Sequence, residues 1–206
     1  MSMLSFCLVH EVNGMRHVLV INANPDPAPE HLSGAFARAY TEGAEAAGAI
    51  VHQLNVGALD FPLLRYAADF MVAPIDPAIL SARGQILLAD HIVYIYPLWL
   101  GGPPAMLKGF MEQIARGGFA LTTEGKGFPR GVLKGRSARV IVTMGMPVML
   151  YRLIYGAHGV KAFNRSILGI SGIRPVRTTC FGGIGTPMAQ PEKMISQVRT
   201  LGRRLR

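Results

Sequence analysis

Residues 17–27 read HVLVINANPDP and decide how the fold begins. The branched apolar side chains of residues 17–23 are typical of a strand buried in a parallel sheet, and the Asn- and Pro-rich residues 24–27 end that strand in a loop. Residues 32–47 are rich in alanine and carry larger apolar side chains at every fourth position, which predicts a helix that Gly48 stops. This order of strand, loop and helix predicts the first unit of an α/β fold.

The same alternation continues along the chain. Strands are expected at residues 50–55, 91–96, 138–143 and 176–181, and helices at residues 76–88, 105–116 and 191–205. Strands that alternate with helices imply right-handed crossovers and a parallel sheet covered on both faces. We therefore expect a three-layer α/β sandwich around a five-stranded parallel sheet. Residues 117–135 are rich in glycine and are expected to form a long surface excursion near the ligand.

Length and composition fit a single domain that does not cross a membrane. The chain has 206 residues, of which 50% are hydrophobic and 16% charged, so it can bury a substantial core. We place the domain at residues 15–206 and interpret residues 1–14 as an N-terminal extension that makes a poor signal peptide. No apolar run reaches the roughly 18 residues that span a bilayer. The residues that interrupt the most hydrophobic region are Arg152, His158, Lys161 and Arg165.

The cysteines and the net charge bear on compartment and partners. Cys7 and Cys180 lie far apart and match no metal-ligand spacing, so we expect no disulfide framework, no metal site and a reducing cytoplasm. The formal net charge is +9, but the basic residues are scattered and form no nucleic-acid recognition motif. We expect no nucleic-acid partner, and a positive field suits anionic ligands such as nucleotide phosphates.

Three loops are the candidates for ligand binding. In an open parallel sheet, ligands bind beyond the carboxyl ends of the strands, at the point where the strand order reverses. That rule selects the loops that begin at Asn24, Pro97 and Thr143.

The loop at residues 97–104 reads PLWLGGPP and suits a flat heteroaromatic ligand. Gly101 and Gly102 allow a close approach of the backbone to such a ligand, and the prolines stiffen the loop. Trp99, the only tryptophan, could supply an aromatic wall. A proline-rich connector with a buried Trp99 is the alternative interpretation.

Separated motifs carry a resemblance to a known family. PLWLGG at residues 97–102, followed by PAMLKG at residues 104–109, resembles the flavin-binding loop and following helix of NAD(P)H quinone oxidoreductases. TMGMP at residues 143–147, followed by Tyr151 and by GAHG at residues 156–159, is similar to that family's second flavin loop and catalytic segment. The resemblance covers the whole expected domain, and the motifs agree in order.

The resemblance implies a fold, a cofactor and a reaction. It implies a flavodoxin-like sheet in the order 2-1-3-4-5 and a homodimer with the active site at the subunit interface. The cofactor would be FMN or FAD, with FMN favoured because no extension beyond the last helix is seen to hold an adenosine. NAD(P)H would reduce the flavin and leave, and a quinone or other small acceptor would take two electrons in the same cavity, by a ping-pong mechanism.

The resemblance also assigns roles to individual residues. Tyr151 and His158 match the tyrosine and histidine near the reduced flavin, where they can stabilise negative charge. The spacing between them is one residue longer than in mammalian members, so Tyr155 is a rival for the tyrosine role. A tyrosine of the core and a histidine that satisfies local backbone groups are the structural alternatives. The cofactor-binding residues implied are Asn24, His31, Leu32, Ser33, Pro97, Leu98, Trp99, Leu100, Gly101, Thr143, Gly145 and Met146.

Two positions depart from the family pattern. Asn24 stands where many relatives have histidine, in a loop whose following helix could hold a phosphate with its first amides, helped by His31 and Ser33. Asp26 and Glu30 would repel a phosphate and are expected to point to solvent, and an ordinary helix-capping turn is the alternative for His31. Leu100 stands where relatives often have a second aromatic residue, which predicts a different acceptor preference.

Three other functions are compatible with the same sequence. A flavodoxin-like electron carrier shares the fold, although such carriers tend to be acidic and this chain is basic. A regulatory subunit that binds a transport protein would keep the fold, and the basic terminus of the chain leaves that interpretation open. Reduction of azo or nitro compounds is a close variant of the quinone reaction.

Overall fold

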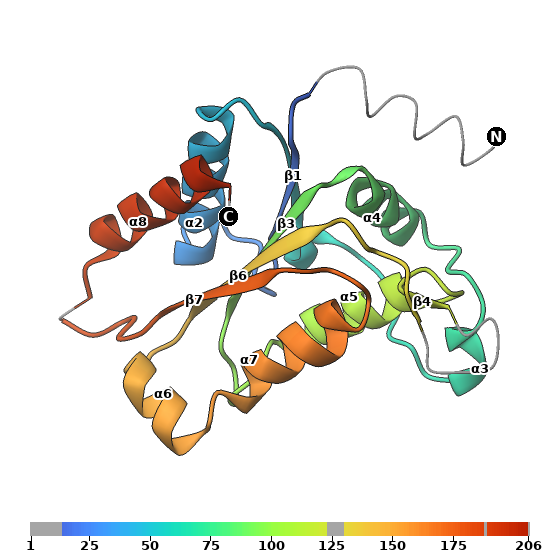
Figure 1. The fold of residues 1–206 in the computed structure, drawn as a ribbon. Coiled ribbons are helices and arrows are strands. Elements are labelled where there is room, and N and C mark those ends of the chain that lie inside the picture. The colour runs from blue at the N-terminus through green and yellow to red at the C-terminus, as the bar shows by residue number, and fades with distance from the viewer. Residues whose placement is uncertain (1–13, 123–129, 188, 206) are drawn as a thin grey trace.

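The computed structural model describes residues 14–122, 130–187 and 189–205, which form a parallel sheet between two layers of helices (Figure 1). The strands of the sheet are β1 (His17–Asn22), β2 (Ile50–Asn55), β3 (His91–Pro97), β6 (Ser137–Thr143) and β7 (Val176–Phe181). Their order is β2-β1-β3-β6-β7, and every neighbouring pair is parallel. The five expected strands and the order 2-1-3-4-5 are confirmed. The expected extension, apart from Gly14, lies outside the described residues.

The helices cover both faces of the sheet (Figure 1). On one face lie α2 (Leu32–Glu45) and α8 (Pro191–Arg204), and on the other lie α4 (Pro77–Leu88), α5 (Ala105–Ala115), α7 (His158–Ala162) and the π-helix η2 (Phe163–Gly169). Alternate side chains of β3 enter opposite cores, because successive residues of a strand point to opposite faces. Val93 and Ile95 pack on the α2 side, whereas Tyr94 and Tyr96 pack on the α5 side.

Local signals place the helix ends. The four expected helices are present with ends that differ by one or two residues from the sequence prediction. Asp76 caps α4, since its carboxylate accepts hydrogen bonds from the amides of Ala78 (2.9 Å) and Ile79 (3.1 Å). Residues 148–169 were predicted without elements, but they form α6 (Val148–Ile154), α7 and η2.

The glycine-rich excursion packs at the end of η2 and contributes Leu133 to the core on the α5 side of the sheet. Its described parts contain a small antiparallel pair, β4 (Leu121–Thr122) and β5 (Arg130–Gly131), and residues 123–129 lie outside the described residues. The amide of Leu133 donates to the carbonyl of Ser171 at 2.8 Å, which ties the excursion to the end of η2. Before α4 come two short helices, η1 (Val56–Ala58) and α3 (Ala67–Phe70). Among the described ranges, no helix is long and apolar enough to cross a membrane.

Candidate active site

The three loops selected from the sequence lie together at the carboxyl edge of the sheet. They follow β1, β3 and β6, which are neighbours in the sheet. The amide of Ala23 donates to the carbonyl of Ile95 at 2.8 Å, and the amide of Leu98 donates to the carbonyl of Thr143 at 2.7 Å. Backbone hydrogen bonds therefore set the relative positions of the three loops.

The first loop leads into a helix whose first turn has no side-chain cap. The N-cap residue of α2 is His31, and its side chain makes no capping hydrogen bond. Among the described residues, the amides of Leu32 and Ser33 have no hydrogen-bond acceptor. The positive end of the helix dipole and these amides together form an anion-binding arrangement.

Polar side chains of the first loop contact one another. The side-chain amide of the buried Asn24 donates to the hydroxyl of Ser33 at 3.1 Å, and the imidazole of His31 lies 2.8 Å from the carboxylate of Asp26. Asp26 and Glu30 are exposed, as expected. A hydrogen bond from the amide of Ala28 and the contact with His31 lower the pKa of Asp26. His31 would have to leave Asp26 to bind a phosphate.

The second loop is a tight turn that presents bare backbone. Trp99 and Gly102 exchange two backbone hydrogen bonds, of 2.9 and 3.0 Å, around Leu100 and Gly101. Both central residues have positive φ angles, +48° for Leu100 and +80° for Gly101. Their amides have no acceptor among the described residues, and the space beside the Cα atoms of Gly101 and Gly102 is open. A flat ligand could therefore approach this backbone closely. Trp99 is half exposed, which disagrees with a buried connector.

The third loop leaves β6 at the buried Thr143 and is held by backbone bonds to the segment after β7. The amide of Ile184 donates to the carbonyl of Met144 at 3.1 Å. Gly145 is exposed, and within the described ranges neither its amide nor that of Met146 has an acceptor. Pro97 and Leu98 are partly buried between this loop and the turn at Trp99.

A glycine from another segment supports each loop, a feature that the sequence did not reveal. A Cβ atom added to Gly57 would overlap the carbonyls of Asn24 and Pro25, one added to Gly159 would overlap the carbonyl of Gly101, and one added to Gly182 would overlap that of Met146. Backbone thus packs directly on backbone behind all three loops. Gly159 belongs to the quoted motif at residues 156–159, but its spacing alone did not predict this contact.

The two candidate tyrosines lie in different environments. Tyr151 is fully buried, and its hydroxyl donates to the carbonyl of Gly101 at 2.9 Å and accepts from the amide of Val160 at 3.4 Å. Burial raises the pKa of Tyr151, although the bond from Val160 acts in the opposite direction. Tyr155 is 49% exposed, and His158 is exposed as well. Tyr151 therefore fixes the turn at Trp99, whereas Tyr155 and His158 have side chains that a ligand can reach.

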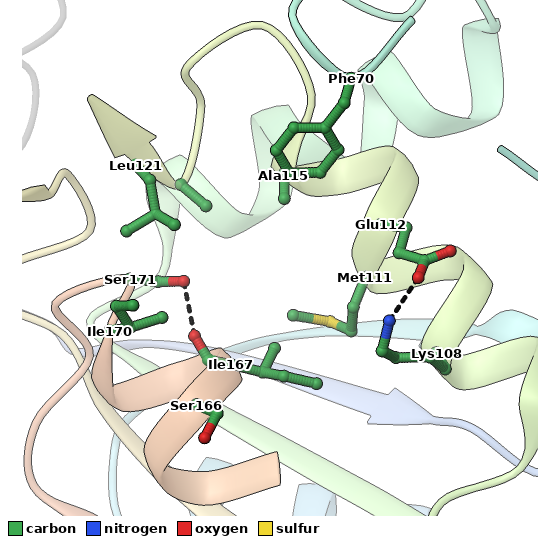
Figure 2. A pocket seen from close by; sticks show the side chains of 11 residues that line it. Phe70, Lys108, Met111, Glu112, Ala115, Leu121, Ser166, Ile167, Ile170 and Ser171 are labelled. Carbon is green, nitrogen blue, oxygen red and sulfur yellow. Dashed lines mark hydrogen bonds and ion pairs between the residues drawn. The ribbon is translucent and has the colours of Figure 1, made fainter. Parts of the chain in front are cut away.

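A separate apolar pocket lies on the outside of α5 (Figure 2). It has a volume of about 210 Å³, and Phe70, Met111, Leu121 and Ile167 point into it from four different elements. At its rim, Lys108 and Glu112 form an ion pair along α5. None of the three loops contributes to this pocket. A second hollow of about 220 Å³ borders the first loop at Pro27–Pro29.

The described residues contain no cluster of three or more side chains that could hold a metal ion.

Comparison with known proteins gives the family. The model for the family described as "Flavodoxin-like fold" matches residues 16–205. The chain belongs to this family.

Several known proteins are similar to parts or to all of the chain. An uncharacterised NAD(P)H oxidoreductase of Haemophilus influenzae is 36% identical over 48% of this chain and 49% of its own length. An FMN-dependent NADH:quinone oxidoreductase of Bordetella petrii is 35% identical over 34% of this chain and 36% of its own. These matches span about half or less of the relatives. The solved NAD(P)H:quinone oxidoreductase of Methanothermobacter marburgensis is 21% identical, with a TM-score of 0.74 over 93% of this chain and 98% of its own, which shows the shared fold.

Proposed function

We propose that this chain is a flavin-dependent NAD(P)H:quinone oxidoreductase. The observation that carries the proposal is the meeting of three segments with unengaged backbone amides at one edge of the sheet: Leu32 and Ser33, Leu100 and Gly101, and Gly145 and Met146. A flat ring with polar edges and a phosphate tail is a ligand that such an arrangement fits. The name of the Bordetella petrii relative supports FMN and a quinone acceptor.

The residues at this edge divide naturally between the parts of FMN. The uncapped first turn of α2, at Leu32 and Ser33, would hold the phosphate, and Asn24 would fix Ser33 from behind. The open backbone from Leu98 to Gly101 would contact one edge of the ring, with Trp99 beside it. Thr143, Gly145 and Met146 would line the other edge.

Flavin supplies the two-electron chemistry, and the chain orients the reactants. In the overall reaction, NAD(P)H, a proton and a quinone give NAD(P)⁺ and the hydroquinone. We propose that donor and acceptor use the same open side of the turn at Trp99 in succession, which gives ping-pong kinetics. His158 and Tyr155 are exposed on the segment whose Tyr151 and Gly159 contact Gly101, and they would donate hydrogen bonds to developing negative charge. Tyr151 acts through the position of Gly101.

We also propose that the chain forms a homodimer through the outer face of α5 and η2. The apolar pocket of Figure 2 opens on this face, and Ile170 at its edge is 44% exposed. Because α5 begins three residues after Gly102, a partner on this face would lie beside the flavin loop. We expect Ile170→Glu to give a monomer in sedimentation equilibrium, whereas Ile75→Glu, at an exposed position outside the pocket, leaves the dimer intact.

Spectroscopy and kinetics of the purified chain test the proposed activity. The chain should bind FMN, lose the absorbance of oxidised flavin when NADH or NADPH is added without oxygen, and recover it with a benzoquinone. Steady-state rates should give the parallel double-reciprocal lines of a ping-pong enzyme. A chain that binds neither FMN nor FAD contradicts the proposal. Flavin that binds but is not reduced by NAD(P)H favours an electron carrier or a regulatory subunit, and faster turnover of an azo dye than of quinones favours the azoreductase variant.

Substitution of His158 tests its role. We expect His158→Ala to slow flavin reduction by about tenfold to a hundredfold, the lower range of what a positioned acid–base group contributes, without release of the flavin. His52→Ala removes an exposed histidine of the edge strand β2 and is the matched control. Stopped-flow absorbance measures both variants, and equal reduction rates for His158→Ala and the wild type refute the assignment.

A further inference from the structure

The turn between α6 and α7 has an unusual backbone (Figure 1). Gly156 and Ala157 both have positive φ angles, +56° and +52°, and Ala157 is the N-cap residue of α7. A left-handed conformation is unfavourable for alanine, and strained backbone of this kind is concentrated at functional sites. The chain keeps this turn although it is strained, so the reason is to be sought in the side chain that the turn holds.

The side chain that the turn holds is the imidazole of His158. A Cβ atom added to Gly156 would lie 2.5 Å from Nε2 and 2.9 Å from Cδ2 of this ring. Real Cβ atoms do not approach other heavy atoms so closely, and the ring therefore occupies the space that any other side chain at position 156 would fill. Glycine is thus required here twice, by the positive φ angle and by the ring that packs on its Cα atom.

The backbone on both sides of His158 is held against the turn that contains Gly101. Before His158 in the chain, the hydroxyl of Tyr151 donates to the carbonyl of Gly101 at 2.9 Å and accepts from the amide of Val160 at 3.4 Å. After it, Gly159 packs so closely that an added Cβ atom would overlap the carbonyl of Gly101. Backbone contacts therefore set the position of the His158 Cα atom relative to this turn, and the side-chain torsions remain to be fixed.

No polar contact fixes those torsions within the described ranges. The imidazole of His158 is exposed and has neither a hydrogen bond nor an ion pair to another described residue. An exposed side chain of this kind samples several rotamers unless packing favours one of them. We propose that Gly156 is a positioning residue for His158, because its bare Cα atom is the surface that holds the imidazole in one orientation beside the turn that contains Gly101.

The positioning role has a consequence for catalysis that rests on the proposed function. His158 would donate a hydrogen bond to developing negative charge, and a donor that is already oriented stabilises this charge without first being ordered. A side chain at position 156 would displace the ring, because the three atoms nearest to that side chain all belong to His158. We therefore expect Gly156→Ala to lower the rate of flavin reduction and to leave flavin affinity nearly unchanged.

NMR spectroscopy of the full chain tests the contact without an assay of activity. With isotope-labelled histidine, the ring protons of His158 are identified by their absence from His158→Ala, and they should show nuclear Overhauser cross-peaks to the α protons of Gly156. In Gly156→Ala these ring signals should move to new chemical shifts. Gly48→Ala is the matched control, since Gly48 has φ of +81° and open space where a side chain would lie. It places alanine in the same left-handed backbone but displaces no ring.

Stopped-flow absorbance of the FMN-loaded chain tests the consequence for catalysis. We expect Gly156→Ala to lower the limiting rate of flavin reduction by about tenfold, with little change in the concentration of NAD(P)H that gives half of this rate. Gly156→Ala/His158→Ala should be no slower than His158→Ala, because a ring that is absent cannot be displaced. Gly48→Ala should reduce flavin at the wild-type rate, although both glycine variants lose stability in urea.

The two measurements separate failure of the contact from failure of the proposed function. Missing cross-peaks in the wild type, or ring signals of His158 that do not move in Gly156→Ala, refute the contact. Equal reduction rates in Gly156→Ala and Gly48→Ala, or effects of the Gly156 and His158 substitutions that multiply, refute the positioning role. If the cross-peaks are present but NAD(P)H does not reduce the flavin of the wild type, the proposed function fails together with the catalytic consequence, whereas the contact stands.

Discussion

The two edges of the same sheet treat their polar groups in opposite ways. At the amino edge, the buried His91 contacts the hydroxyl of Tyr40 at 3.1 Å and that of Ser137 at 2.8 Å. Arg139 donates to the hydroxyl of Thr179 at 2.8 Å. At the carboxyl edge, backbone amides of three loops have no acceptor among the described residues. Within the described ranges, these unengaged loop amides therefore lie at the edge where ligands of this fold bind.

The comparison separates stability from function. Buried polar groups are expensive when a partner is lost, so substitutions at the amino edge should unfold the chain without a specific effect on flavin. Substitutions at the carboxyl edge should change flavin binding or turnover with a smaller effect on unfolding. Each variant below is therefore measured for both properties.

The largest effect is expected at the amino edge, from the titration of His91. Burial, with a smaller contribution from the charge of Arg139, lowers the pKa of His91 from 6.5 to about 4. Below pH 6.5 the unfolded chain takes up a proton that the folded chain does not accept until about pH 4. Stability from His91 is therefore complete above pH 6.5 and is lost through this window, by on the order of 3 kcal/mol. Urea unfolding between pH 7 and pH 4 measures the loss.

Variants distinguish His91 from the other groups that titrate in acid. His91→Gln keeps a side chain that can bond Tyr40 and Ser137 but cannot titrate. The slope of its unfolding free energy against pH should therefore be smaller than in the wild type, by the equivalent of about one proton. His52→Gln, on the exposed edge strand, should keep the wild-type dependence. If the unfolding free energy of all three proteins depends on pH in the same way, His91 is not the cause of the loss of stability in acid.

Substitution of a glycine at the carboxyl edge should give the next largest effect, which is on flavin affinity rather than on the free energy of unfolding. In Gly159→Ala, the new methyl group overlaps the carbonyl of Gly101, so the turn at Trp99 must shift. Overpacking of this kind costs about 1–3 kcal/mol, which corresponds to up to about a hundredfold in the flavin dissociation constant. Gly84→Ala in α4 meets open space and should bind flavin normally. Flavin titration compares them, and normal affinity in Gly159→Ala contradicts the proposed loop site.

Two buried tyrosines offer a matched pair with a smaller effect. Tyr151→Phe removes the hydroxyl that bonds Gly101 and Val160, so flavin affinity and turnover should fall by up to about tenfold, the value of one to two hydrogen bonds. Tyr96→Phe removes a buried hydroxyl without a partner among the described residues and should be neutral or stabilising. If both variants lose flavin equally, the hydrogen bond of Tyr151 is not the cause.

The sequence predicted the fold well because its signals are local. The composition of residues 17–23 alone predicts a buried strand. Asp76 followed by Pro77 indicates the start of a helix without any distant contact. Residues 148–154 gave no such signal. Their side chains are apolar on nearly every side of the helix, and only the contact of Tyr151 with Gly101, fifty residues earlier, decides which one is buried.

The site was predicted at the level of loops, less well at the level of side chains. The switch-point rule located the loops after Asn24, Pro97 and Thr143, and all three lie at one edge. The sequence did not predict that His31 contacts Asp26, or that Tyr151 is enclosed while Tyr155 is open. These facts depend on side-chain directions and on close backbone packing at Gly57, Gly159 and Gly182. Pattern and spacing carry little information about either.

The smallest expected effect tests whether backbone strain also belongs to the carboxyl edge. Leu100 has φ of +48°, a left-handed conformation that costs a leucine about 1 kcal/mol, and its side chain is fully exposed and gains no packing within the chain. Asparagine adopts this conformation more readily, so Leu100→Asn should raise the free energy of unfolding by up to about 1 kcal/mol in urea. A gain in stability means that the chain keeps a strained leucine at the edge of the sheet where ligands of this fold bind. Unchanged stability would mean that the turn is relaxed and that the two edges differ only in their hydrogen bonds.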